Sequence, residues 1–240
     1  YLVIGASGDG DKGAKSGSAY VFKKDGDTWS QQQKLTASDG SKYEYFGLSV
    51  SISGDYLITG VFADDDYKGS AYMFKRDGDT WTEHQKLIAS DGEKVDYFGL
   101  SVSMSGDYLV VGAYRDDDKG SESGSVYVFK KDGDTWSQQQ KLIASDGASN
   151  DFFGRFVSMS GDYLVIGASE FQGKGSAYVF KRDGDTWSQQ QRLYASDGAK
   201  LDYFGSSVSI SASAIVISAS GDDDKGRESG SVYVLNNYKE

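Results

Sequence analysis

No cysteine and no proline occur in the 240 residues, and histidine occurs once, as His84. Without cysteine the chain has no disulfides, no cysteine-based zinc site and no thiol nucleophile, although this does not settle the compartment. No apolar run reaches the length of a membrane-spanning helix, and no charged segment precedes an apolar one as in a secretory signal. We therefore expect no direct membrane insertion. Because Tyr1 lies within a strand-like run, we interpret the chain as a fragment or a processed product.

The composition favours an all-β protein. Hydrophobic residues make up 38% of the chain, enough for a sizeable core, and aromatic residues make up 14%. The 31 glycines suit strands joined by tight turns, because glycine permits positive φ. No stretch has sustained helical periodicity. The net charge of −11 repels phosphate backbones and anionic lipid, so we expect no nucleic acid partner.

Four tryptophans reveal an internal repeat. Trp29, Trp81, Trp136 and Trp187 lie 52, 55 and 51 residues apart, each at the end of an Asp-Gly-Asp-Thr-Trp block. Asp-Gly between two strand-like runs is a strong hairpin signal. The chain is therefore a tandem array of one β-sheet unit.

Residues 97–143 illustrate the four short strands that we expect in each unit. The first begins at Phe98 and alternates apolar residues with Gly or Ser, which predicts a strand with one small face. The second, residues 108–112, is almost continuously apolar and is expected to be covered on both faces. The third covers residues 125–129. The fourth, residues 135–142, is polar enough for an edge, and we expect its glutamine run to be exposed.

A gradient from a small inner strand to a polar outer strand is typical of a β-propeller blade. We predict an all-β chain that forms a single propeller domain of four-stranded antiparallel blades over residues 1–240. Eighteen strands are expected, because the first repeat lacks its first strand and the last repeat lacks its last. Both a closed five-bladed ring and a part of a larger propeller agree with this count. The five repeats span approximately residues 1–42, 43–94, 95–149, 150–200 and 201–240.

These units resemble FG-GAP repeats, the blades of integrin α-subunit propellers and of many microbial and algal surface proteins. Phe-Gly pairs match the first half of the motif at residues 46–47, 98–99, 153–154 and 204–205. Gly-Ala-Ser or Gly-Ala-Tyr matches the second half at residues 5–7, 112–114 and 167–169, with weaker copies at 60–62 and 218–220. The resemblance covers nearly the whole chain and implies a propeller.

The chain departs from this family at the calcium site. Integrin-type blades carry a calcium loop of the Asp-x-Asp-x-Asp-Gly type between the first and second strands. Here that connection is only Ser-Gly-Asp, at residues 53–55, 105–107 and 160–162. A two-residue turn cannot surround a cation that takes roughly six to eight oxygen ligands. We therefore expect no calcium at that position.

Acidic runs lie instead in the loop between the second and third strands. Carboxylates and loop carbonyls are hard oxygen ligands of the kind that calcium prefers, so these runs are the candidate calcium ligands. A lysine follows each run closely, and the fourth loop, which begins at Glu170, has no aspartate. The alternative interpretation is a solvated loop. The candidate ligands are Asp9, Asp11, Asp64, Asp65, Asp66, Asp116, Asp117, Asp118, Asp222, Asp223 and Asp224.

Two other features recur before each Phe-Gly pair. An acidic pair flanks a glycine turn, and we expect these acids to hydrogen-bond the backbone of their own turn in preference to sharing a cation. The pairs are Asp39 with Glu44, Asp91 with Asp96, Asp146 with Asp151, and Asp197 with Asp202. An aromatic residue follows, at Tyr45, Tyr97, Phe152 and Tyr203. We interpret these rings and the tryptophans as packing between blades, with a sugar-stacking platform as the alternative.

Nothing in the sequence has the pattern of a catalytic site. Arg155, Phe156 and His84 depart from the repeat, but no triad or metal-ligand setting surrounds them. We therefore expect a non-catalytic extracellular or cell-surface module for binding or adhesion, with calcium as its candidate cofactor. A protein or polysaccharide ligand is expected, and a place in a larger surface assembly. The alternatives are a multivalent carbohydrate-binding lectin and, as a weaker option, a propeller glycoside hydrolase with paired carboxylates.

Overall fold

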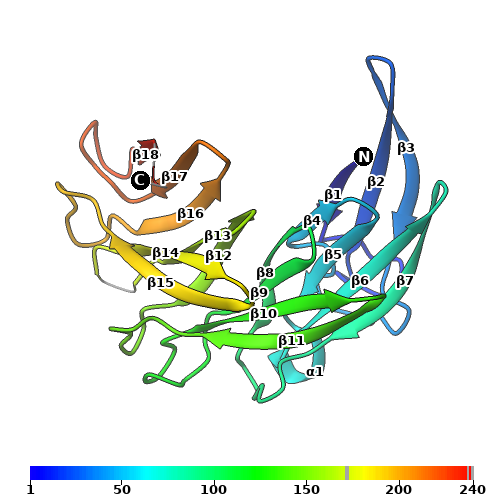
Figure 1. Cartoon of the computed structure of the whole chain (residues 1–240), viewed down its shortest axis with the longest axis horizontal. Coiled ribbons are helices and arrows are strands. Elements are labelled where there is room, and N and C mark those ends of the chain that lie inside the picture. Colours follow the sequence, from blue (N-terminus) through cyan, green and yellow to red (C-terminus); the bar gives the residue numbers. More distant parts are fainter. Residues whose placement is uncertain (171–172, 237, 239–240) are drawn as a thin grey trace.

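The computed structural model describes residues 1–170, 173–236 and 238, and these form five antiparallel sheets arranged as the blades of a β-propeller (Figure 1). The first blade contains the strands β1 (Leu2–Ala6), β2 (Ser18–Asp25) and β3 (Thr28–Leu35), and the second contains β4 (Val50–Ser53), β5 (Tyr56–Val61), β6 (Ser70–Asp77) and β7 (Thr80–Leu87). The third blade contains β8 (Phe98–Ser105), β9 (Tyr108–Ala113), β10 (Ser125–Asp132) and β11 (Thr135–Leu142). The fourth contains β12 (Phe153–Ser160), β13 (Tyr163–Ala168), β14 (Ser176–Asp183) and β15 (Thr186–Leu193), and the fifth contains β16 (Phe204–Ile210), β17 (Ala214–Ala219) and β18 (Ser231–Asn236). The predicted fold class is confirmed, and the described residues form the eighteen predicted strands. No helix among the described residues is long and apolar enough to cross a membrane.

The predicted hairpins form, with small differences at their ends. In the third blade Asp132 pairs with Thr135, so Gly133 and Asp134 make the turn, and Gly133 has the positive φ of 57° that such a turn requires. One predicted strand was too long: the first strand of the second blade begins at Val50, four residues after Phe46. A short helical turn, α1 (Asp64–Tyr67), also stands where we expected only a loop, although Asp65 and Asp66 have left-handed dihedral angles.

The second strand of each interior blade is covered on both faces, as its apolar run predicted. In β9, Leu109 and Val111 pack toward the second blade and Val110 packs toward the fourth, and all three are fully buried. Four hydrophobic clusters of this kind fill the four contacts between neighbouring blades. Because each of the three interior blades contributes to the core on both of its sides, the core is a series of layers and not a single centre.

Glycine pairs set how closely two blades approach. A Cβ atom placed on Gly60 of β5 would lie 1.7 Å from the carbonyl oxygen of Gly99 in β8, and one on Gly112 of β9 would lie 2.0 Å from that of Gly154 in β12. Gly99 also has a φ of 95°, which other residues rarely adopt. The Gly of one blade and the Phe-Gly of the next are therefore required for backbone contact.

Serine side chains join neighbouring inner strands. The Ser51 hydroxyl accepts a hydrogen bond from the backbone N–H of Met104 at 3.1 Å, and the Ser103 hydroxyl accepts one from Met159 at 3.0 Å. The small face predicted for the first strand thus lies where adjacent strands crowd together. Each hydroxyl satisfies a backbone donor that has no partner in its own sheet.

The glutamine runs do more than cover an exposed edge, which corrects our expectation. In the outer strand β7, Gln85 Nε2 donates to the carbonyl of Trp136 at 2.7 Å, and Gln85 Oε1 accepts from the Trp136 N–H at 2.9 Å. Gln33 binds the Trp81 backbone in the same way, and Gln140 binds that of Trp187. One glutamine in each of β3, β7 and β11 therefore joins its blade to the next, and the tryptophan side chains of those next blades are buried, as predicted.

The ring of five blades is open between the first and the last. The two terminal blades occupy opposite arms of the arc (Figure 1), and among the described residues no strand of one packs extensively on a strand of the other. Trp29 of β3 is 46% exposed, whereas its equivalent Trp136 is 2% exposed. Val234 of β18 is 58% exposed, whereas its equivalent Val128 is fully buried. Repeat residues that are core in the interior blades are therefore surface at the two ends.

Replacing Gly60 by alanine is expected to lower the free energy of unfolding by roughly 1–3 kcal/mol, because the added methyl group must push two backbones apart. Gly60 does not have a positive φ, so an alanine there causes no backbone strain. The loss of stability therefore measures the contact between the two backbones alone. Gly8→Ala is the matched control, since a Cβ there meets nothing within 4 Å. Urea unfolding measures both variants, and equal midpoints for the two would contradict the backbone contact.

Candidate functional site

One rim of the propeller gathers the sequence features singled out above. In the third, fourth and fifth blades the end of the second strand pairs with the start of the first strand, as Phe98 does with Ala113 in the third blade. The loop after the second strand therefore begins beside the start of the first strand. Tyr97 and Tyr114, the residues just outside this pair, therefore lie at the same rim. The acidic loops and the glycine turns before each Phe-Gly pair meet there.

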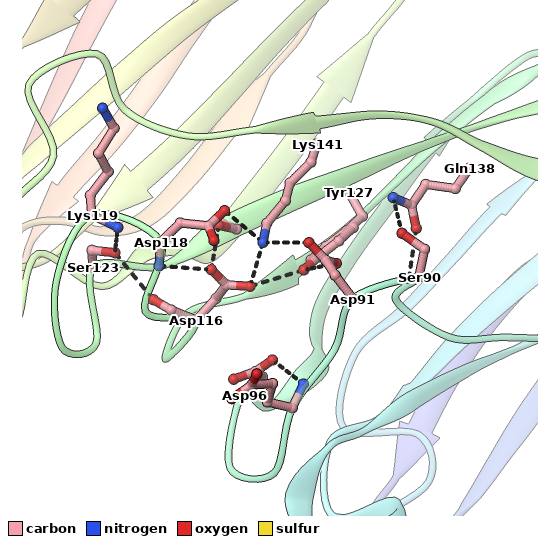
Figure 2. A network of polar contacts seen from close by, with 12 residues as sticks. Ser90, Asp91, Asp96, Asp116, Asp118, Lys119, Ser123, Tyr127, Gln138 and Lys141 are labelled. Carbon is pink, nitrogen blue, oxygen red and sulfur yellow. Dashed lines mark hydrogen bonds and ion pairs between the residues drawn. The ribbon is translucent and has the colours of Figure 1, made fainter.

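The acidic loop of the third blade surrounds a lysine (Figure 2). The Lys141 ammonium of β11 lies 2.9 Å from an Asp91 carboxylate oxygen, 2.8 Å from one of Asp116 and 2.6 Å from one of Asp118. Tyr127 of β10 donates its hydroxyl toward Asp91 and Asp116, each at 2.9 Å. The Lys141 ammonium also lies 5.2 Å from the centroid of the Tyr127 ring. A cation is thus already built into this carboxylate cluster.

Burial and ion pairing shift the pKa values of these side chains in opposite directions. Burial disfavours the charge of Lys141, but hydrogen bonds to Asp116, Asp118 and Asp91 outweigh it and raise the lysine pKa. Burial likewise opposes ionisation of Asp91, and Lys141 and Tyr127 nevertheless hold its pKa below the usual value. Asp96 forms no ion pair among the described residues, and burial raises its pKa to about 6 although Lys141 acts in the opposite direction.

The same arrangement recurs around the ring. In the first blade Lys34 pairs with Asp9 at 2.9 Å and also with Asp11. In the second, Lys86 pairs with Asp39 at 2.9 Å and Asp64 at 2.7 Å. In the fourth, Arg192 pairs with Asp146 at 2.6 Å. Each basic side chain comes from the outer strand, so the cluster ties the rim loops to that strand.

The fifth blade has the acids without the cation. Tyr233 of β18 donates its hydroxyl toward Asp197 at 3.0 Å and Asp222 at 3.3 Å, as Tyr127 does toward its own pair. Asp222 is only 3% exposed. Among the described residues, neither Asp197 nor Asp222 forms an ion pair with a lysine or arginine.

The structure separates the predicted calcium ligands into different roles. Asp9, Asp11, Asp64, Asp116 and Asp118 pair with the outer-strand lysines. Others have different partners: Asp66 pairs with Lys94 at 2.6 Å, and Asp117 accepts from the Glu122 backbone N–H at 2.7 Å. Asp65 and Asp223 are exposed. Within residues 1–170, 173–236 and 238, no three acidic or histidine side chains gather in a geometry that would hold a metal ion.

The connection between the first and second strands, where integrin-type blades carry their calcium loop, is too short to hold calcium here. Strands β4 and β5 are joined by Gly54 and Asp55 alone, and Asp55 forms an ion pair with Arg76. The tight turn predicted there is confirmed, and it leaves no loop that could wrap a cation.

The two acids of each pair that flanks a glycine turn have different hydrogen-bond partners. The second acid of each pair accepts a backbone N–H of its own turn, as predicted; Asp96 accepts from Glu93 at 2.6 Å and Asp151 from Ala148 at 2.7 Å. The first acid of the first three pairs instead binds the tyrosine and the basic side chain of the cluster, as Asp91 does, and Asp197 binds its tyrosine. Sequence reasoning missed this role.

A continuous run of rings, which we call the aromatic track, crosses the rim of the second to fourth blades. The Tyr45 and Phe62 ring centroids are 5.4 Å apart with nearly parallel planes, and those of Phe62 and Tyr97 are 5.5 Å apart at 11°. Tyr97 then meets Tyr114 at 5.4 Å, and Tyr114 meets Phe152 at 5.7 Å. Packing between blades was predicted for Tyr45, Tyr97 and Phe152, but not for Phe62 and Tyr114. What was not predicted is that all but Phe152 remain partly open to solvent.

Arginines lie along the aromatic track. The Arg115 guanidinium is 5.0 Å from the Tyr97 ring centroid and 5.6 Å from that of Tyr114. The Arg155 guanidinium is 5.8 Å from the centroid of Tyr114. These two arginines, Tyr114 and Phe152 line a cavity of about 350 Å³ together with Glu122 and Asn150. The rim thus combines flat apolar faces with charged hydrogen-bonding groups, the usual composition of a ligand site.

A sequence signal for this track exists. The second strand of each repeat carries a glycine near its end, replaced by Ser218 in the fifth repeat. The residue two positions later is serine in three repeats, Ser7, Ser169 and Ser220. In the second and third repeats it is Phe62 and Tyr114. Arg155 likewise stands alone at its repeat position. Departures from the repeat, and not the repeated aspartates, indicate the surface that is specific to this chain.

Comparison with known families agrees with the blade structure. A model described as FG-GAP repeat matches residues 29–74, 81–129, 136–180 and 187–235, which together cover most of the chain. No individual curated protein matches the sequence significantly.

Replacing Lys141 by methionine is expected to destabilise the fold by about 2 kcal/mol, because three carboxylates would share a partly buried site without a cation. Lys119→Met is the matched control, since Lys119 is exposed and its side chain points away from the cluster (Figure 2). Adding Asp116→Asn to the Lys141→Met variant should restore part of the loss. Urea unfolding tests all three, and equal effects at the two lysines would contradict a structural cation.

Proposed function

Because the chain belongs to the FG-GAP repeat family, we propose that it is a non-catalytic binding module whose ligand surface is the rim that carries the aromatic track. Flat, half-exposed rings interleaved with guanidinium groups are the observation that carries this proposal. Such rings are costly to leave in water unless a ligand covers them.

The rim is well suited to present these side chains. Tyr97 has a φ of 59°, a left-handed conformation that is uncommon outside glycine. It is followed directly by the buried Phe98 and by Gly99, whose backbone is fixed against the neighbouring blade. A ring held at a strained position by rigid neighbours is preorganised, which reduces the entropy lost on binding.

The ligand class follows from these groups. We propose a protein or polysaccharide ligand met outside the cell or at the cell surface, where FG-GAP repeats are typically found, in an adhesive role and as part of a larger surface assembly. Arginine and tyrosine are the residues that most often dominate binding surfaces. The net charge of −11 disfavours nucleic acid as the ligand.

A carbohydrate ligand is the second candidate, favoured by one observation. The pocket beside Tyr114 combines aromatic faces with Arg115, Glu122 and Asn150, and a sugar ring needs both a face to stack on and polar groups for its hydroxyls. Unlike the lectin suggested by the repeat, this site would be single, because Tyr114 and Arg155 occur in one blade each.

Catalysis by paired carboxylates is a weaker explanation of the acidic residues. A glycoside hydrolase needs one acid kept protonated and a second kept ionised, both facing the substrate. The clustered acids of the first four blades are instead engaged by lysine, arginine or tyrosine from their own blade. We therefore propose a module that binds and does not turn over its ligand.

Replacing Tyr97 by alanine should weaken ligand binding roughly tenfold or more, as expected for a central ring of a binding surface. Tyr194→Ala is the control, because Tyr194 is 70% exposed but lies outside the aromatic track. A glycan array and a screen against extracellular proteins identify the ligand, and titration then compares the variants. Equal losses for the two tyrosines would argue against the track, and turnover of any arrayed glycan would argue for an enzyme.

Calcium support is the second part of the proposal. Lysine holds the place of a cation in the first three blades, and arginine holds it in the fourth. We propose that any calcium is confined to the fifth blade, where Asp197, Asp222 and Asp224 have carboxylate oxygens and no ammonium among the described residues. With few ligands drawn together, such binding would be weak.

Millimolar calcium is therefore expected to raise the melting temperature slightly above that measured with a chelator at equal ionic strength. The Asp222→Asn variant should lose this difference, whereas Asp116→Asn should keep it. A melting temperature that is the same with calcium and chelator would remove calcium from the proposal. A calcium-dependent shift that is lost in the Asp116→Asn variant would place the calcium site in the third blade and contradict the proposed fifth-blade site.

A further inference from the structure

Arg155 differs from the other arginines of the chain in its charge pairing. Five of the six arginines form an ion pair with an aspartate or a glutamate: Arg76, Arg115, Arg182, Arg192 and Arg227. Among the described residues, the exposed Arg155 guanidinium has neither an ion pair nor a hydrogen bond. On a chain with a net charge of −11, this guanidinium is available to an anionic group from outside.

The fold itself does not require an arginine at this position. A β-bulge at the start of β12 contains Gly154 and Arg155. The third and fifth blades form the same bulge with Leu100 and Ser206 in the place of Arg155. Bulges redirect side chains and are common beside binding sites. The charge at Arg155 is therefore additional to what the blade needs.

A cavity of about 430 Å³ lies beside Arg155, between the fourth and fifth blades. Its described lining residues are Arg155, Phe156, Ser169, Tyr203, Ser206 and Ser220, and none of them is acidic. Ser169 is 2% exposed, and its hydroxyl has no hydrogen-bond partner in the described part of the chain. A buried hydroxyl without a partner is costly, so a polar group that enters the cavity and bonds it is favoured.

Arg155 also lines the cavity of about 350 Å³ beside Tyr114, so the two cavities meet at this side chain. The Arg155 guanidinium lies 5.8 Å from the ring centroid of Tyr114 and 5.8 Å from that of Phe156. Both volumes fall within the range of roughly 300–1,000 Å³ that is usual for small-ligand sites. A ligand made of linked rings can therefore place one unit in each cavity, with the guanidinium between them.

We propose that Arg155 selects an acidic polysaccharide, in which a carboxylate or sulfate group on a sugar unit binds the guanidinium. Arginine donates two parallel hydrogen bonds to such a group. The Tyr203 ring and the serine hydroxyls of the larger cavity meet the face and the hydroxyls of the sugar. An acidic peptide has the charge but no flat polar ring for the cavities. This inference rests on the proposed ligand rim and adds the charge of its ligand.

Three oligosaccharides of equal length test this preference by calorimetric titration. The first is built of hexuronic acid units, the second is the neutral hexose oligomer, and the third is that oligomer with sulfate groups. We expect at least one acidic oligomer to bind about tenfold more tightly than the neutral one, because only the acid can pair with Arg155. The acidic oligomer that binds more tightly shows whether the anionic group is a carboxylate or a sulfate.

Variants of the protein locate the binding. Arg155→Leu places the residue of the third repeat in the bulge, so the urea midpoint should hold while the acidic oligomer binds about tenfold more weakly. Lys24→Leu is the control, because it removes the same charge at the exposed end of β2, which lies opposite the rim loops. Ser169→Tyr, which introduces the equivalent of Tyr114, should fill the larger cavity and weaken binding although Arg155 remains.

Four results would overturn the proposal. They are absence of binding, equal affinity for acidic and neutral oligomers, equal losses in Arg155→Leu and Lys24→Leu, and undiminished binding in Ser169→Tyr. An aspartate peptide that binds as tightly as the acidic sugars and depends on Arg155 would assign the site to a protein ligand and also contradict it.

The role of Arg155 and the proposed ligand rim can fail separately. Binding of the neutral oligomer that depends on Tyr97, without any preference for acid, would refute the role of Arg155 and leave the rim in place. A preference for acid that depends on Arg155 but not on Tyr97 would support the acidic ligand and refute the aromatic track as its surface.

Discussion

The close backbone contact between neighbouring blades is the constraint on which the rest of the structure depends. Gly60 lies against Gly99, and the same contact joins each later pair of blades. No side chain fits between them, so this contact sets the distance at which aliphatic faces meet and serine hydroxyls reach the next inner strand. At the outer edge, Gln85 and its equivalents can reach a tryptophan backbone only because that distance is the same in every repeat.

The acidic loops illustrate how one composition can serve two kinds of chemistry. Carboxylates crowded on a loop need a positive charge, and a metal ion or an ammonium group can supply it. Here the outer strand supplies Lys141 or its equivalent, so the charge that holds the loop also holds the strand. Among the described residues the fifth blade has no outer strand, and its Asp197 and Asp222 form no ion pair there.

Repetition and departure from it carry different information in this chain. The glycines, the cluster tyrosines and the outer-strand lysines recur because each blade must solve the same packing problem. Phe62, Tyr114 and Arg155 do not recur, and they meet on one part of the rim. A site that is specific for a ligand has no reason to appear in every blade, so these residues, together with the neighbouring Tyr97, distinguish the proposed ligand surface from the repeated packing residues.

The sequence by itself determined the repeat, the hairpin turns, the strand order within a blade and the family, because these depend on neighbours close in the chain. It also identified the acidic loops, but it could not show that Lys141 enters them, since Asp91, Asp116 and Lys141 are far apart in sequence. The aromatic track, the glutamine contacts between blades and the open ends were decided only by the tertiary structure. Each depends on which residues of adjacent blades face one another across a fixed distance, and alternation within a strand cannot encode that distance.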